Sequence, residues 1–101
     1  MLAEFTIFPI GKDVSLSKYV ARSLRLIDES GLSYRINPMG TVVEGSWDEV
    51  MELVKKCHMA ILEDTERVST TIKIDDRKGV VNALDRKIKS VEEKVGKELK
   101  K

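Results

Sequence analysis

The chain has 101 residues, of which 42% are hydrophobic and 35% are charged, a mixture typical of one globular domain spanning residues 1–101. Its 18 basic and 17 acidic residues leave a net charge of +1, without the basic excess on which nucleic-acid binding depends, so we expect no nucleic-acid partner. No apolar run approaches the roughly 18 residues of a membrane span, so we expect no membrane partner either.

Cysteine usage and the first residues predict a cytoplasmic protein. The single cysteine, Cys57, can form no disulfide within the chain, and the N-terminal residues show no basic segment followed by an apolar block. Glutamine is absent whereas lysine and glutamate are abundant, a bias that favours a thermophilic source.

The chain begins with a predicted strand and a predicted helix. Apolar and polar residues alternate over residues 2–9, which predicts a strand with one apolar face. A helix is expected to follow, with Ser15 as its N-cap and Gly31 as the left-handed residue after its end. The apolar residues of this helix recur every three or four positions in one stripe: Leu16, Val20, Leu24 and Ile27.

A hairpin and a second helix come next. Residues 32–36 and 41–44 read as two short strands joined by the turn sequence Asn37-Pro38-Met39-Gly40. Ser46 and Glu49 have the spacing of a capping box, which predicts a helix that begins after Ser46 and ends near Asp64. The predicted buried stripe of this helix consists of Trp47, Val50, Val54, Cys57 and Ile61.

A final strand and helix complete the expected fold. Residues 67–75 alternate clearly between apolar and polar side chains, and residues 81–95 show a helical repeat. The resulting order predicts an α+β protein with a ferredoxin-like β-α-β-β-α-β antiparallel sheet and an additional C-terminal helix. Both main helices would cover one face of the sheet. The opposite face would lie open, so we expect a homo-oligomer.

The sequence offers little for catalysis, and we expect no enzyme. It contains no glycine-rich phosphate loop, no H-E-x-x-H and no C-x-x-C. Cys57 and His58 are neighbours on a helix and point roughly 100° apart, so they are poorly placed as nucleophile and base. Cys57 is predicted to lie in the core, and His58 either flanks the core or contacts a ligand. One histidine and one cysteine are too few for a zinc site, so we expect neither metal nor cofactor.

The segment from Asn37 to Trp47 combines a proline, two glycines, a threonine, a carboxylate and a tryptophan. A hairpin followed by a capped helix explains the glycines and Ser46 but explains Glu44 less well, because Glu44 shares a strand face with apolar Val42. A ligand contact by Glu44 or Thr41 is therefore the second interpretation of this segment.

These residues resemble the thiamine-binding protein family. The matching segments run in order along nearly the whole chain and include Ser30-Gly31-Leu32-Ser33-Tyr34, Pro38-Met39-Gly40-Thr41 with Glu44-Gly45, Trp47-Asp48-Glu49-Val50-Met51 and Lys73-Ile74-Asp75-Asp76-Arg77. The loop Glu63-Asp64-Thr65-Glu66 departs from the family pattern, which has a glycine and fewer acidic residues there.

The resemblance implies ferredoxin-like protomers whose sheets pack face to face in a dimer, with dimers joining as tetramers. It also implies a non-catalytic protein that binds thiamine or its hydroxymethylpyrimidine moiety at a subunit interface, in pyrimidine or thiamine salvage and uptake. The alternative is a regulatory or scaffold module of the same fold that senses another metabolite.

Six residues are candidate ligand contacts in this interpretation. An aminopyrimidine is flat and carries alternating donors and acceptors, so it suits an apolar slot with a few fixed polar groups. Thr41 and Ser15 can supply hydroxyls, and Glu44 can accept from the 4-amino group or from a protonated ring nitrogen. The candidate walls of the slot are Tyr34, Phe8 and Met39.

Overall fold

The computed structural model describes residues 1–11, 16–79, 83–98 and 100. Its elements are β1 (Leu2–Ile10), α1 (Leu16–Glu29), β2 (Ser33–Asn37), β3 (Gly40–Glu44), α2 (Trp47–Leu62), β4 (Arg67–Asp75) and α3 (Ala83–Val95). The four strands form one antiparallel sheet, which confirms the α+β, ferredoxin-like class. Ser15, the expected N-cap of α1 and a candidate ligand contact, lies outside the described residues.

The strand order in the sheet is β2-β3-β1-β4. β4 pairs with β1 along its whole length, from Leu2 opposite Asp75 to Ile10 opposite Arg67. β3 pairs with β1 only from Leu2 to Phe5, because the chain turns at Pro38 and Met39 to form the β2–β3 hairpin. Half of β1 therefore extends beyond the end of β3.

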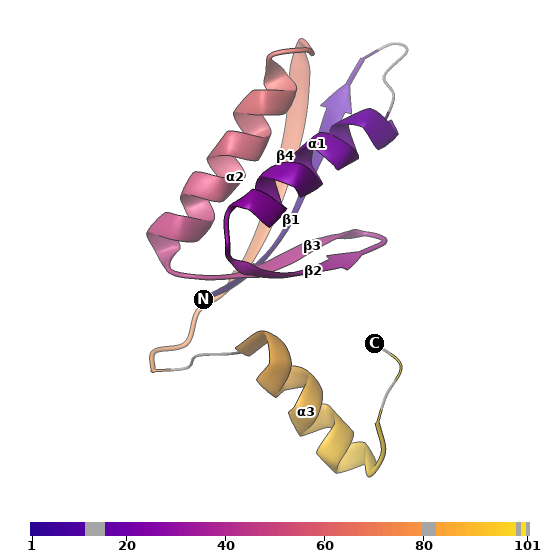
Figure 1. The fold of residues 1–101 in the computed structure, drawn as a ribbon, viewed down its shortest axis with the longest axis vertical. Helices are drawn as coiled ribbons and strands as arrows, with labels where there is room; N and C mark the ends of the chain where they lie inside the picture. Colours follow the sequence, from indigo (N-terminus) through magenta and orange to yellow (C-terminus); the bar gives the residue numbers. More distant parts are fainter. Residues whose placement is uncertain (12–15, 80–82, 99, 101) are drawn as a thin grey trace.

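The helices α1 and α2 lie together on one face of the sheet, as expected, whereas α3 lies apart from them and contacts β3 (Figure 1). The core fills the space between the sheet and the two helices. Its buried residues are Ala3, Phe5, Ile27, Val43, Val50, Leu53, Val54 and Cys57.

The predicted buried stripes of the two main helices are each wrong at one residue. Val20 is exposed, because α1 turns the adjacent Tyr19 into the core in its place, while Ile27 of the stripe is buried. Trp47 is 55% exposed, because it is the first residue of α2 and has no preceding helical turn over which its side chain could pack. Leu53, which the stripe omitted, is buried.

Ion pairs link α1 to the loop that follows α2. The Arg22 guanidinium donates to Asp64 Oδ2 at 2.7 Å and to Glu63 Oε2 at 3.1 Å. These two acidic residues belong to the loop that departs from the family pattern. In this chain they connect the end of α2 to the middle of α1.

Cys57 is a core residue, as predicted. Its Sγ lies 3.9 Å from the carbonyl oxygen of Ser23, and burial raises the pKa of its thiol to about 11. His58 points instead to β4, where its Nδ1 lies 2.6 Å from Thr70 Oγ1.

The capping box of α2 is present as predicted. Ser46 Oγ accepts from the Glu49 N–H at 3.2 Å, and Glu49 Oε1 accepts from the Ser46 N–H at 2.9 Å. The hydrogen bond from the Ser46 backbone holds the pKa of Glu49 below its usual value.

Replacing Ser46 by alanine should lower the free energy of unfolding by about 1 kcal/mol, because an N–H in the first turn of α2 loses its acceptor. Urea denaturation followed by circular dichroism measures this change. Ser90→Ala, at an exposed position within α3, is the control and should leave the unfolding midpoint of the sheet and core nearly unchanged.

Cys57 should react slowly with a thiol reagent in the native protein at about pH 8, because only the thiolate is nucleophilic and the buried thiol remains protonated. Unfolding in urea should restore the rate of an ordinary free thiol. Rapid labelling of the native protein would contradict a buried and protonated Cys57.

Candidate functional site

A cavity of about 540 Å³ lies where β1 extends beyond β3. Its walls come from the second half of β1, from α1 and from the tip of the β2–β3 hairpin. The walls are mostly apolar, and the threonines Thr6 and Thr41 are among the polar residues that line it. Both the volume and the lining are typical of sites that bind small molecules.

The hairpin tip is fixed closely against β1 at the mouth of this cavity. Thr6 Oγ1 donates to the carbonyl oxygen of Met39 at 3.1 Å. A Cβ atom on Gly40 would lie 2.9 Å from Thr6 Oγ1 and 3.2 Å from the carbonyl oxygen of Phe5, so a larger residue at this position would have to displace Thr6 or the β1 backbone. The tip therefore ends beside Thr6 and does not continue along β1.

The structure brings three of the six candidate contacts together. Phe8, Met39 and Thr41 all line the cavity. Thr41 is only 9% exposed, whereas Phe8 and Met39 are 51% and 85% exposed and form part of the rim. The cavity thus combines a recessed hydroxyl with an open apolar entrance.

Tyr34 and Glu44 do not line this cavity in the same protomer. The Tyr34 hydroxyl donates to Asp28 Oδ1 at 2.9 Å, and this hydrogen bond, together with the charge of Asp28, raises the pKa of Tyr34. Glu44 lies opposite Leu2, at the other end of β1 from Phe8. Glu44 also lies on the opposite face of the sheet from Thr41, because the two are three residues apart on one strand.

Sequence reasoning missed Thr6 and Tyr19, which also line the cavity. Both lie in elements that were predicted, but nothing in the sequence indicates that β3 ends beside Thr6. The sequence also does not reveal that α1 is rotated so that Tyr19 is buried. Tyr19 lies beside a regular apolar stripe that ends in Ile27, and that stripe alone would account for the buried side of the helix.

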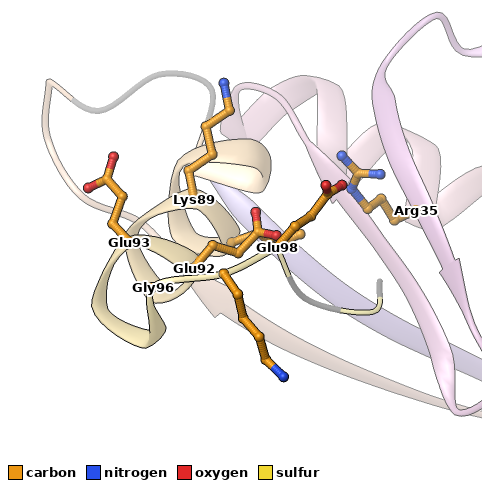
Figure 2. Close-up of a pocket in the computed structure, with 8 residues that line it drawn as sticks. Arg35, Lys89, Glu92, Glu93, Gly96 and Glu98 are labelled. Atoms are coloured by element: carbon orange, nitrogen blue, oxygen red, sulfur yellow. The ribbon is translucent and has the colours of Figure 1, made fainter.

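A second cavity, of about 510 Å³, lies between α3 and β2. Figure 2 shows Arg35 of β2 across from Glu92 and Glu98, with Lys89 also at the cavity. Its lining is largely charged, and Ile88 is the single large apolar residue among the described residues that line it. The walls of this cavity do not suit a flat aromatic ring, so we take the cavity beside β1 as the candidate site.

Within the described ranges, no group of three or more histidine, cysteine, aspartate or glutamate side chains could hold a metal ion. In the same ranges, no helix has both the length and the apolar character needed to cross a membrane.

Known proteins match the chain over almost its full length. A UPF0045 protein of Methanocaldococcus jannaschii is 40% identical over 92% of this chain and 93% of its own, and a UPF0045 protein of Methanothermobacter thermautotrophicus is 43% identical over 92% of this chain and 97% of its own. The crystal structure of a hypothetical protein from Methanocaldococcus jannaschii superimposes with a TM-score of 0.83 at 40% identity, covering 91% of this chain and 95% of that one.

A more distant structure shares the fold. It comes from Thermotoga maritima, is named as a candidate thiamine biosynthesis or salvage protein, and superimposes with a TM-score of 0.77 at 23% identity over 89% of this chain and 96% of that one. The sequence profile of the thiamine-binding proteins matches residues 3–92. The chain therefore belongs to the thiamine-binding protein family.

Proposed function

We propose that the protein binds thiamine or its hydroxymethylpyrimidine moiety in the cavity beside β1 and catalyses no reaction. The cavity carries this proposal, because it has a volume suited to a small molecule, mostly apolar walls and the recessed hydroxyl of Thr41. Membership of the family supports a small-molecule ligand, and the name of the Thermotoga maritima protein supports thiamine chemistry.

The hydroxyl of Thr41 is suited to bind a ligand. It makes no hydrogen bond to another group among the described residues, yet every fully enclosed polar side-chain atom in that part of the chain has a partner. The hydroxyl must therefore be reachable from the cavity that Thr41 lines. A ligand placed there can donate to it or accept from it.

Large apolar side chains surround the cavity and support an assembly of several copies. Phe8, Val20, Ile36 and Met39 are all exposed and all line the cavity. Exposed apolar groups that gather in one region mark a surface that another molecule covers. We propose a cytoplasmic homo-oligomer, a dimer of dimers, in which a second copy covers this rim and completes the site.

Glu44 can contribute to such a site only from another subunit. Its position at the far end of β1 and on the other sheet face separates it from the cavity of its own protomer. A neighbouring copy can bring its carboxylate to the positive thiazolium of thiamine, where opposite charges attract.

The proposed absence of catalysis agrees with the state of the two reactive side chains. The Cys57 thiol is buried and its pKa is raised to about 11, so the nucleophilic thiolate is scarce near neutral pH. The His58 imidazole is directed to Thr70 and not to the cavity.

Thr41→Val should weaken binding of thiamine and of hydroxymethylpyrimidine by about tenfold, because one hydrogen bond to the ligand is lost. Isothermal titration calorimetry on ligand-free protein measures this. Thr70→Val is the matched control, since Thr70 faces His58 and lies outside the cavity. Binding of neither compound to the wild-type protein would reject the proposed function.

Phe8→Glu should break the proposed assembly into smaller species, because a carboxylate would be buried against the second copy. Light scattering after size-exclusion chromatography gives the mass. Trp47→Glu changes a side chain of similar exposure outside the cavity and should leave the mass unchanged. A wild-type protein with the mass of a single chain would contradict the assembly.

A further inference from the structure

The two edges of β1 differ in the second half of the strand. On one side, β4 pairs with every residue from Leu2 to Ile10. On the other side, the pairing with β3 ends at Phe5. Among the described residues, no strand lies along this second edge from Thr6 to Ile10. Within the described residues, the backbone of that stretch therefore has no strand partner on this side.

The register shows which backbone groups face this free edge. The Gly45 N–H donates to the carbonyl oxygen of Met1, so Met1 and the alternate residues after it direct their backbone groups to the β3 side. In the second half of the strand these residues are Ile7 and Pro9. Ile7 presents an N–H and a C=O side by side, whereas Pro9 has no N–H and presents only a C=O.

The free edge borders the candidate cavity. Ile7 and Pro9 both line it, together with Thr41. The register would place Met39 opposite Ile7, but Met39 belongs to the hairpin turn and its carbonyl oxygen accepts from Thr6 Oγ1 instead. Within the described residues, the hairpin tip thus gives the N–H and C=O of Ile7 no strand partner on the side of the cavity.

The composition of this edge favours a small ligand over an added strand. A strand that paired here would find a complete donor and acceptor pair at Ile7 alone, because Pro9 interrupts the ladder. A flat heterocycle that carries an amino group beside a ring nitrogen requires only one such pair. Its amino group can donate to the Ile7 carbonyl, and its ring nitrogen can accept from the Ile7 N–H.

We propose that the backbone N–H and C=O of Ile7 form the recognition edge of the site and select flat nitrogen heterocycles with an amino group next to a ring nitrogen. This inference rests on the proposed function, in which that heterocycle is the aminopyrimidine of thiamine. Selection then depends on backbone groups that every residue type except proline supplies at this position.

Ile7→Pro tests the role of the N–H directly. The variant removes a donor that faces the free edge, so it leaves the hydrogen bonds between β1 and β4 intact. Pro9 shows that the same edge of this strand accepts proline. Ile7→Val is the matched control, because it shortens the side chain but keeps the N–H.

Calorimetry with hydroxymethylpyrimidine and with its 4-oxo analogue should separate the variants. The amino compound should bind Ile7→Pro about tenfold more weakly than it binds Ile7→Val, because the two variants differ in the N–H. The 4-oxo analogue should bind wild type about tenfold more weakly than the amino compound. Its ring N–H would face the Ile7 N–H, and its oxygen would face the Ile7 carbonyl oxygen.

Nuclear magnetic resonance of the wild-type protein supplies a second measurement that does not depend on the folding of Ile7→Pro. The Ile7 amide proton should shift downfield when hydroxymethylpyrimidine is added. Equal binding by Ile7→Pro and Ile7→Val, or an unmoved Ile7 amide in the bound protein, would overturn the recognition edge and leave the proposed function standing. Failure of wild type to bind either thiamine or hydroxymethylpyrimidine would overturn both.

Discussion

The candidate site depends on the difference in length between β1 and β3. β1 has nine residues and β3 has five, and the hairpin closes where Asn37 pairs with Gly40. A longer β3 would cover the second half of β1 and fill the space that the cavity occupies. The turn at Pro38 and Met39 is thus the local feature that creates the opening.

The remaining contacts hold α1 over that opening. Tyr34 ties β2 to Asp28 near the end of α1, and Arg22 ties the middle of α1 to the loop after α2. The Arg22 ion pairs are largely exposed, so they contribute little to the free energy of folding. Their effect is to orient α1, whose apolar side rests on the core and supplies one wall of the cavity.

Local patterns in the sequence predicted the elements well. The capping box at Ser46 and Glu49 and the alternation from Arg67 to Asp75 each specify an element through contacts between near neighbours. The exposure of Val20 could not be predicted in the same way. It follows from the rotation of α1 against α2 and the sheet, which depends on residues distant in the sequence.

The candidate site was harder to predict than the fold. Thr41 and Glu44 are three residues apart on one strand, so the period of two already places them on opposite faces. The gathering of Phe8, Met39 and Thr41 around one cavity depends on where β3 ends relative to β1, a long-range property that no local pattern encodes. The backbone of Ile7 leaves no signal in the sequence, because every residue type except proline offers the same groups.

In the proposed assembly, ligand binding and association are linked. A second copy that covers Phe8 and Met39 also closes the entrance to the cavity, so the bound ligand and the subunit contact stabilise one another. By thermodynamic reciprocity, the factor by which association raises ligand affinity equals the factor by which the ligand raises the affinity between subunits. Pro9 limits strand addition at the same edge, so in this proposed assembly the copies meet through side chains on the rim and not through β1 pairing. The edge of β1 thereby remains free for the ligand while the apolar rim serves the contact between subunits.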